Sequence, residues 1–372
     1  MNNMYRKRIL YIGGFELPDG NAAAQRVLSI AKSLKDEYAI SFLGITHGDN
    51  YSGNVYGFEY INLPYPETKK EWLAHLQGDK ELKYIKEHKP DIVVCYNFPA
   101  WGLYRVQKYC RRNNIKIVGD ITEWYQPYNL LKQIDTEWRM KRLNFQMDGL
   151  IVISRYLEDY YEGQKMVRIP PTVDLRDKKW SIDNPEKKFA ECINLMYAGS
   201  PGRGDKDRLE NLVRTIGGYE HLKLDVVGVT EDWFCEEFPE VLIPKNVMFH
   251  GRLPHEKVIS MLCESDFSVF FRQPSRANNA GFPTKFAEAQ TAGIPVISSK
   301  FSDLEDYVVE GENGFLANGI EKEDIDAVLA RVASLDRNDI EEMHSYTREH
   351  RVFDLQRYNN SLRLFFESIL RQ

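Results

Sequence analysis

The chain has 372 residues, of which 43% are hydrophobic and 28% are charged. This composition is typical of a globular protein and excludes a disordered chain, and at about 150 residues per domain the length predicts two domains. The five cysteines are odd in number and form no CxxC pair, which disfavours a disulfide framework or a zinc site and suits a reducing cytosol. The basic residues 5–8 precede only four apolar positions, 9–12, too few for a secretory signal or a membrane span. We therefore expect a cytoplasmic protein.

Charge is unevenly distributed along the chain. Residues 1–172 contain 24 Lys and Arg against 20 Asp and Glu, a net charge of +4, whereas the rest contains 25 against 35, a net charge of -10. Two interpretations stay open: a basic first half that favours a phosphate-bearing acceptor or peripheral contact with the inner face of a membrane, or a solvated surface without function. Five basic residues on or beside one predicted helix motivate the membrane interpretation: Arg105, Lys108, Arg111, Arg112 and Lys116. Nucleic acid is not an expected partner.

Short β-branched or aromatic runs alternate with amphipathic helical stretches from end to end, a pattern typical of parallel sheets covered by helices on both faces. In the first half, strands are expected at 9–13, 39–44, 58–62, 91–96, 115–119 and 150–154. Helices are expected between them near 22–34, 80–87, 103–112 and 131–146. In the second half, strands are expected at 194–198, 223–228, 247–250, 267–271, 295–299 and 314–316.

Prolines at 170 and 171, followed by the charged stretch 176–188, predict a linker between two domains. We expect an N-terminal Rossmann-like domain over residues 1–172, a second over 173–350, and a C-terminal helix in 351–372 that packs back on the first domain. The predicted fold class is α/β, with two doubly wound parallel sheets facing a cleft. Ligands of such sheets bind at the loops that follow the strands.

Two glycine-bearing loops follow the first predicted strand of each half. Gly13 and Gly14 would let a ligand approach the backbone closely, although a tight turn that serves only the fold explains them equally well. In the second half, Gly199 is followed by Arg203 and Lys206 at the start of a helix. Cations there oppose the helix dipole unless an anion lies between, which favours them as ligands of a diphosphate. Solvated loop cations are the alternative interpretation.

A third loop, residues 272–283, leads into a short helix that begins near Pro283 and ends at Gly293. Glu288 lies in the middle of this helix. Its carboxylate could accept two hydroxyl hydrogen bonds from a ribose, and an exposed helical glutamate without function is the alternative.

Several segments together resemble the group-one, family-four retaining glycosyltransferases of the GT-B fold, and the resemblance extends over nearly the whole chain. The matching segments are 13–14, 152–154, 168–174, 197–200 with Lys206, 249–253, and 281–297, of which the last is the most specific. The resemblance implies that the first domain binds the acceptor and the second binds a nucleotide sugar. It also implies that Arg203 and Lys206 hold the diphosphate and that Glu288 holds the ribose. The donor site would further include Gly14, Gly199, Gly228, Arg252, Asn279, Ala280, Gly281, Phe282 and Pro283.

The sequence departs from the family's pattern at two places. Where the family has the first of two glutamates separated by seven residues, this chain has Ala280, so backbone groups of 279–282 would replace the carboxylate, or the donor lacks or modifies the hydroxyl it binds. The second departure follows the strand at 115–119, where many relatives have a histidine and this chain has none. Asp120 or Glu123 could orient an acceptor hydroxyl there, while a turn-capping role for Asp120 is an equally open interpretation.

The expected function is transfer of a sugar from a nucleoside diphosphate to a hydroxyl of a glycan or lipid-linked acceptor, with retention, in the synthesis of cell-surface polysaccharide or glycoconjugate. The catalytic candidates are Asp120, Glu123, Arg203 and Lys206. No histidine has metal-ligand spacing, and we expect neither a metal nor a cofactor other than the co-substrate. Two alternatives stay open: a nucleotide-sugar 2-epimerase on the same fold, and a non-catalytic sugar-nucleotide-binding partner of another transferase.

Overall fold

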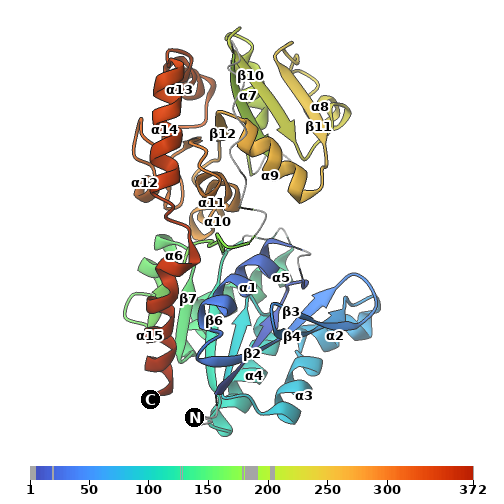
Figure 1. The fold of residues 1–372 in the computed structure, drawn as a ribbon. Helices are drawn as coiled ribbons and strands as arrows, with labels where there is room; N and C mark the ends of the chain where they lie inside the picture. The colour runs from blue at the N-terminus through green and yellow to red at the C-terminus, as the bar shows by residue number, and fades with distance from the viewer. Residues whose placement is uncertain are drawn as a thin grey trace. The chain divides into compact units, whose positions relative to one another are not determined.

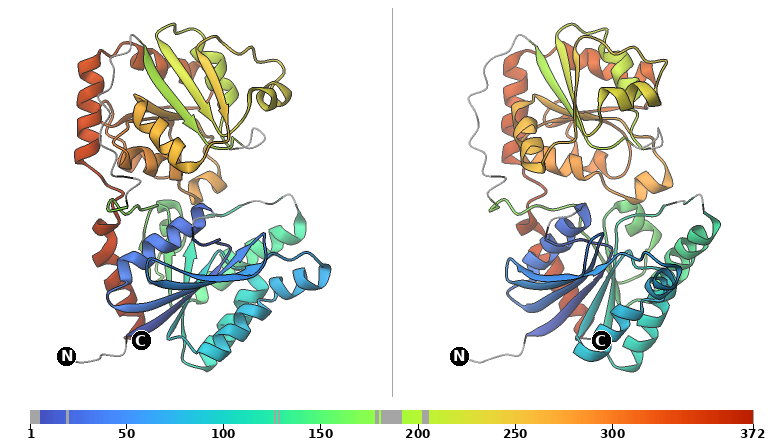
Figure 2. Two further views of the ribbon diagram at one scale, coloured as in Figure 1. Left: turned by 45° about the vertical axis from the view of Figure 1, so that its right-hand side comes forward. Right: turned by 90° about the vertical axis from the view of Figure 1, so that its right-hand side faces the viewer.

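The structure, a computed structural model, describes residues 6–18, 21–125, 127, 129–177, 180, 192–201 and 206–371. The chain forms two compact units. Unit 1 consists of Met1–Thr172, Ala280–Phe282 and Leu355–Gln372, and unit 2 of Val173–Asn279 and Pro283–Asp354. Each unit is a sheet with helices on both faces (Figures 1 and 2). The predicted fold class, α/β with two parallel-sheet domains, is confirmed.

The sheet of unit 1 has eight strands in the order β3-β4-β2-β1-β5-β6-β7-β8. The strands are β1 Lys7–Gly13, β2 Tyr38–Thr46, β3 Tyr51–Val55, β4 Phe58–Pro64, β5 Ile92–Tyr96, β6 Lys116–Ile121, β7 Gly149–Val152 and β8 Met166–Arg168. All neighbours run parallel except the edge strand β3, which pairs antiparallel with β4. The sequence analysis did not anticipate β3 or β8. The strand order reverses at β1 and β5, so this pair is the switch point at which ligands of open α/β sheets bind.

Apolar clusters cover both faces of the unit 1 sheet. Alternate residues of β1 contribute to different clusters, Ile9 and Tyr11 to one and Leu10 and Ile12 to the other, because successive strand residues point to opposite faces. The covering helices are α1 Ala22–Leu34, α2 Lys69–Leu76, α3 Asp79–His88, α4 Ala100–Arg112, α5 Leu130–Trp138 and α6 Arg155–Tyr160. A π-helical turn, Arg139–Leu143, follows α5.

Unit 2 contains a six-stranded parallel sheet in the order β11-β10-β9-β12-β13-β14. Its strands are β9 Ile193–Ala198, β10 Leu222–Val227, β11 Val247–Gly251, β12 Phe267–Phe270, β13 Val296–Ser299 and β14 Gly314–Ala317. The helices between and after them are α7 Leu209–Ile216, α8 Glu231–Glu237, α9 His255–Glu264, α10 Arg276–Ala280, α11 Thr284–Thr291, α12 Leu304–Tyr307, α13 Lys322–Ala333 and α14 Arg337–Glu349. The switch point of this sheet lies between β9 and β12.

The last helix, α15 Asn359–Leu370, belongs to unit 1, to which the chain returns at Leu355 after the unit 2 segment that ends at Asp354. It packs against α1 and β8. Its buried side chains Leu362, Phe365, Phe366 and Ile369 are part of the same apolar cluster as Ile9 and Tyr11.

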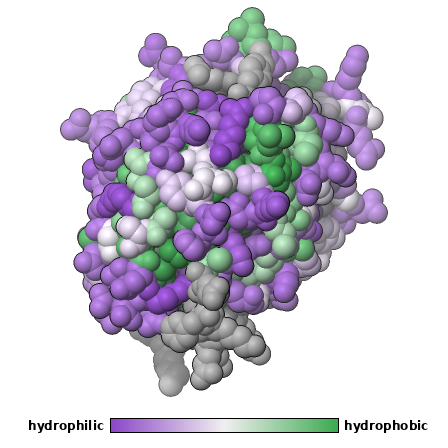
Figure 3. Space-filling model, turned by 90° about the horizontal axis from the view of Figure 1, so that it is seen from above, coloured by the Kyte–Doolittle hydropathy of each residue, from purple (hydrophilic) through white to green (hydrophobic). Residues whose placement is uncertain are grey.

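The surface is largely hydrophilic on the face shown in Figure 3, with smaller apolar areas between the polar ones. Within the described ranges, no helix combines the length and the apolar character that crossing a membrane requires.

Candidate functional site

Three glycines end neighbouring strands at the carboxyl edge of the unit 2 sheet. The amide of Gly199, after β9, donates to Val227 O over 2.9 Å, and the amide of Gly228, after β10, donates to Gly251 O over 2.7 Å. Gly251, the last residue of β11, is the third of these glycines. The φ angles of Gly199, Gly228 and Gly251 are positive, at +142°, +117° and +65°. A Cβ on Gly228 would overlap the carbonyl oxygen of Gly199. The edge therefore presents bare backbone that a ligand can approach closely, and the roles of Gly199 and Gly228 in binding a donor stay predictions.

The sequence predicts three cations at the donor site, Arg203, Lys206 and Arg252, and the structure describes the last two. Arg203 is outside the described residues, as are 202, 204 and 205. Lys206 and Arg252 are both exposed. Their roles in binding a donor stay predictions.

A buried charged cluster that the sequence analysis did not find lies at the switch point of the unit 2 sheet. Asp207 is fully buried, and its Oδ1 accepts a hydrogen bond from Arg272 Nε over 2.7 Å. Its Oδ2 accepts bonds from Lys285 Nζ over 2.6 Å and from the Tyr197 hydroxyl over 2.8 Å. Lys285 Nζ also lies 4.2 Å from the centre of the Tyr197 ring. A Cβ on Gly199 would lie 3.0 Å from Lys285 Nζ, so the ammonium group borders the glycine edge.

The cluster carries one more positive than negative charge. Burial acts to raise the pKa of Asp207, but the charges of Lys285 and Arg272 outweigh it and lower that pKa to about 2. Burial lowers the pKa of Lys285 to about 8. The charge of Asp207 opposes this change, and the charge of Arg272 offsets part of that opposition. Two cations thus share one carboxylate where water is scarce. An anion at this edge would complete the charge balance.

Glu288 lies on α11 and faces the first residue of α9. Its Oε1 is 3.4 Å from His255 Nε2, and its side chain is about one quarter exposed, at 24%. Pro283 immediately precedes α11 as its N-cap. The carboxylate is thus accessible, and among the residues that the structure describes His255 is its one ion-pair partner, which leaves lone pairs for a ligand's hydroxyl groups.

Residues 279–282, where the sequence departs from the pattern that it otherwise resembles, form hydrogen bonds with other parts of the chain. Asn279 Oδ1 accepts a hydrogen bond from the amide of Ser302 over 3.0 Å. Ala280, Gly281 and Phe282 group with unit 1, where the Ser154 hydroxyl donates to Ala280 O over 2.9 Å. Contacts of this segment with a donor sugar stay a prediction.

Asp120, the last but one residue of β6, is fully buried and pairs with Arg26 of α1. Arg26 Nε donates to Asp120 Oδ1 over 2.9 Å, and Arg26 also donates to Ile169 O over 2.9 Å. The Tyr11 hydroxyl is 3.4 Å from Asp120 Oδ2. Burial raises the pKa of Asp120 although Arg26 opposes the change. The structure places Asp120 inside the core as the partner of Arg26, and its role at an acceptor stays a prediction.

Glu123 lies close to a second buried cation, Arg139 of the π-helical turn. Burial lowers the pKa of Arg139, and the charge of Glu123 acts in the opposite direction. Arg139 also reaches Asn97 Oδ1 over 3.4 Å. Asn97 follows β5, so this polar group adjoins the switch point of unit 1. The sequence analysis missed Arg139 because helical periodicity does not reveal a π-helical turn.

The turn after β1 depends on Gly13 and not on Gly14. Gly13 has φ of +151°, and a Cβ there would overlap the carbonyl oxygen of Tyr96. Gly14 is exposed, and a Cβ on it would meet no atom within 4 Å. Space alone therefore does not require glycine at position 14, and its predicted role in donor binding stays untested.

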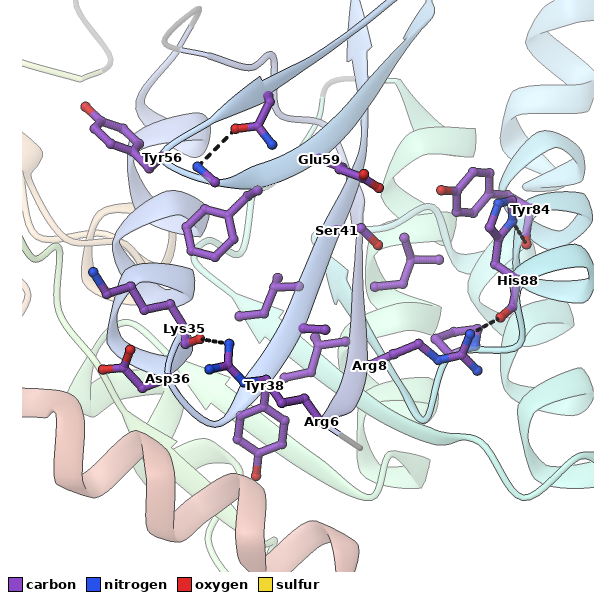
Figure 4. A pocket seen from close by; sticks show the side chains of 18 residues that line it. Arg6, Arg8, Lys35, Asp36, Tyr38, Ser41, Tyr56, Glu59, Tyr84 and His88 are labelled. Atoms are coloured by element: carbon purple, nitrogen blue, oxygen red, sulfur yellow. Dashed lines mark hydrogen bonds between the residues drawn. The ribbon is translucent and has the colours of Figure 1, made fainter. Parts of the chain in front are cut away.

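A cavity of about 650 Å³ lies at the amino edge of the unit 1 sheet, where β1, β2 and β4 begin (Figure 4). Arg8 donates to the carbonyl oxygens of His88 and Lys89 over 3.0 and 2.6 Å, and Arg6 donates to Lys35 O over 3.2 Å. These guanidinium groups satisfy the carboxyl ends of α3 and α1. Ligands of open sheets bind at the opposite edge, so we assign this cavity no role.

A second cavity, of about 660 Å³, lies at the carboxyl edge of β2 and β4 in the same unit. Its lining includes His47 after β2, Tyr65 after β4, and Glu81 on α3. Throughout the described ranges, no three His, Cys, Asp or Glu side chains are grouped so that they could hold a metal ion.

Sequence comparison identifies two similarities. The family model described as "Glycosyl transferases group 1" matches residues 206–350. An "Uncharacterized 41.2 kDa protein in cps region" of Klebsiella pneumoniae is 22% identical over 261 residues, which cover 64% of this chain and 68% of that protein.

Solved structures share the architecture over nearly the whole chain. Sucrose-phosphate synthase from Thermosynechococcus elongatus is 15% identical with a TM-score of 0.76, and the match covers 98% of this chain and 100% of that one. HepE of Anabaena, in complex with UDP-glucose, is 15% identical with a TM-score of 0.68, and the match covers 97% and 99% of the two chains.

Proposed function

We propose that this chain, a glycosyltransferase of the GT-B fold with a group 1 domain over residues 206–350, transfers a sugar from a nucleoside diphosphate to a hydroxyl of a glycan or lipid-linked acceptor, with retention. Unit 2 binds the donor and unit 1 binds the acceptor. The relative from a cps region of Klebsiella pneumoniae supports a role in the synthesis of cell-surface polysaccharide. A structural neighbour in complex with UDP-glucose supports a nucleotide sugar as the donor.

The observation that carries the proposal is the excess positive charge beside the glycine edge of unit 2. Lys285 and Arg272 share the single carboxylate of Asp207, and Lys285 borders the backbone of Gly199. A diphosphate placed on this edge would meet a cation that lacks a full counter-charge and backbone that lets it approach. Glu288, half-buried on α11, accepts hydrogen bonds from hydroxyl groups of the ribose. The exposed Lys206 and the predicted ligand Arg203 add positive charge at the phosphates.

The reaction forms one bond and breaks one. The acceptor oxygen bonds to the anomeric carbon while the bond from that carbon to the donor phosphate breaks, and the nucleoside diphosphate leaves with the electron pair. The acceptor's proton passes to an oxygen of the leaving phosphate, so no protein base is needed, in keeping with the internal pairing of Asp120. Negative charge grows on the diphosphate in the transition state, and fixed cations there stabilise it, each contributing roughly 2.7–4 kcal/mol.

Binding of nucleoside diphosphates tests this proposal directly. UDP, GDP, ADP and dTDP are each added to the protein, and thermal unfolding is measured. A diphosphate at about 100 times its dissociation constant adds about 2.7 kcal/mol of stability. We expect at least one to stabilise the native chain and to stabilise Lys285→Met less at the same concentration. Lys300→Met is the matched control, since Lys300 is exposed and pairs only with Glu305 in the described part of the chain; it should respond as the native chain does.

Incubation with a responding nucleotide sugar separates the proposed reaction from its alternatives. Without an acceptor, slow hydrolysis to sugar and nucleotide agrees with a transferase, whereas release of an epimerised sugar identifies an epimerase and overturns the proposal. Tight nucleotide binding without transfer to any membrane or glycan extract would identify a non-catalytic partner.

Peripheral contact with the inner face of a membrane is a further part of the proposal, motivated by the basic residues around α4. Two of those residues are already paired, Arg105 with Asp79 and Lys116 with Asp148, which reduces the charge offered to a surface. Co-sedimentation with anionic vesicles that weakens with salt would support the contact. Co-sedimentation that is indifferent to salt would contradict it.

A further inference from the structure

The cavity at the carboxyl edge of β2 and β4 in unit 1 has no role in the donor chemistry described above. It measures about 660 Å³, and its walls are the loops after β2 and β4 together with residues of α2 and α3. This volume is in the range of small-molecule sites. The edge is the one at which ligands of parallel sheets bind.

One wall of this cavity is an aromatic side chain held in a fixed orientation. The ring of Tyr65 packs against the ring of His47, with centroids 4.5 Å apart and planes inclined by 30°. It also forms a T-shaped contact with the ring of Trp72, with centroids 5.2 Å apart. Tyr65 is nevertheless 37% exposed. A ring that is supported from two sides and still accessible offers a flat surface, whose negative face attracts the weakly positive C–H groups of a ligand.

Glu81 supplies a hydrogen-bond acceptor to the same cavity. Its residue is only 7% exposed, and it lines the cavity from the first turn of α3. Within the described part of the chain, its carboxylate receives a hydrogen bond only from its own backbone amide. Burial raises its pKa to about 7. A buried carboxylate with so few partners loses much of its solvation without compensation, and such a group calls for a ligand that supplies donors.

The charge of the lining excludes an anionic occupant. Four carboxylates line the cavity, those of Asp49, Glu67, Glu71 and Glu81, against one ammonium group, that of Lys80. These carboxylates form no group able to hold a metal ion within the described ranges, and as hydrogen-bond acceptors they fit a ligand with several neutral donors. Hydroxyl groups on a ring with an apolar face have this chemistry.

We propose that this cavity binds a neutral saccharide residue of the acceptor, with the apolar face of the sugar on Tyr65 and a hydroxyl donating to Glu81. The inference rests on the proposed function, because it assumes that the acceptor of unit 1 is a glycan. It adds the chemical class of that acceptor at a defined place: an uncharged sugar residue, recognised by stacking and by a carboxylate.

Ligand-observed saturation-transfer NMR tests the site without any donor present. The probes are the methyl β-glycosides of glucose, galactose and N-acetylglucosamine at pH 8, with methyl β-glucuronide, which carries no phosphate, as the anionic comparison. We expect saturation of at least one neutral glycoside and none of the glucuronide. Tyr65→Ala and Glu81→Gln should each weaken binding about tenfold. Tyr104→Ala is the matched control, since Tyr104 is 41% exposed on α4 and does not line the cavity.

Three outcomes would overturn the inference: no saturation of any neutral glycoside, equal loss of binding in Tyr65→Ala and Tyr104→Ala, or preferential binding of methyl β-glucuronide. Nucleotide binding is measured on the same samples. If a nucleoside diphosphate stabilises the chain and no glycoside binds, only this inference fails. If glycosides bind through Tyr65 and no nucleoside diphosphate binds, the proposed function fails and the saccharide site remains. In transfer assays, Tyr65→Ala should raise the KM for acceptor and leave the KM for donor unchanged.

Discussion

The ammonium group of Lys285 lies 2.6 Å from Asp207 Oδ2, and the guanidinium group of Arg272 binds the other oxygen of the same carboxylate. Its pKa of about 8 is close to working pH, so its charge is sensitive to an added anion. A bound diphosphate favours the protonated form and raises that pKa. Above about pH 8, binding therefore has to take up a proton, and affinity falls as pH rises.

We expect the dissociation constant for a nucleoside diphosphate to be nearly constant from pH 6.5 to 7.5 and to increase between pH 8 and 9.5. Isothermal titration calorimetry measures this dependence. Lys285→Met should bind about 10- to 100-fold more weakly and lose the dependence above pH 8. An unchanged dependence in that variant would show that another group titrates.

The buried carboxylate of Glu81 predicts that the free energy of unfolding decreases as pH rises. Its pKa is about 7 in the folded chain and 4.5 ordinarily, so the folded chain binds its proton more tightly than the unfolded chain does. The resulting penalty is absent below pH 4.5, grows as pH rises to 7, and is on the order of 3 kcal/mol above that. Glu81→Gln should gain stability relative to the native chain as pH rises from 5 to 8 in urea unfolding. A stability difference that does not change with pH would contradict this assignment.

At the scale of elements, the buried salt bridge between Asp120 and Arg26 joins strand β6 to helix α1 in unit 1. Both side chains are buried, and the shortest distance between them is 2.8 Å. Removing one partner leaves an uncompensated charge in the core, which destabilises proteins by about 3–5 kcal/mol.

Asp120→Ala should therefore lower the free energy of urea unfolding by about that amount. The control Glu87→Ala, which removes an exposed pair with Lys83, should change it by less than about 1 kcal/mol. If Asp120→Ala were as stable as the native chain yet failed to transfer sugar, Asp120 would have the role at the acceptor that the sequence suggested.

The contact between the ends of β9 and β10 depends on glycine. Gly228 has φ of +117°, and a Cβ on it would overlap Gly199 O. Gly228→Ala should separate the two strand ends and weaken nucleotide binding in calorimetry. Gly311→Ala is the control, since its φ of +83° carries a similar strain and a Cβ there meets no atom within 4 Å. Equal nucleotide affinity in the two variants would show that this contact is not part of the donor site.

At the scale of the molecule, the chain returns to unit 1 for its last helix, and the core of that unit includes side chains from both ends of the sequence. Phe366 is fully buried among residues of β1 and α1, whereas Leu364, two positions away on α15, is 51% exposed. Phe366→Ala should destabilise unit 1 by about 3–5 kcal/mol.

Hydrogen exchange followed by mass spectrometry can assign this loss to one unit. In Phe366→Ala, peptides from β1 and β2 should exchange faster and those from β12 and β13 at the native rate. Leu364→Ala should leave both groups unchanged. Faster exchange in both units would show that they unfold together.

The sequence by itself determined the α/β class and the strands β1, β2, β4 to β7 and β9 to β14 to within a few residues. These follow from local signals, because hydrophobic period and glycine at strand ends act over a few neighbouring residues. The edge strand β3 and the short β8 escaped because their pairing partners, and not their own pattern, make them strands. The positions of Gly199 and Gly228 at one edge were likewise implied, since parallel strands end together.

Only the tertiary structure decided which charges meet. Asp207, Arg272 and Lys285 come from segments up to 78 residues apart, and nothing local marks them as one cluster. The same holds for Asp120, whose buried partner Arg26 lies 94 residues earlier. Electrostatic and hydrogen-bond partners are selected by distance in space, and folding brings together side chains whose separation along the chain carries no trace of that proximity.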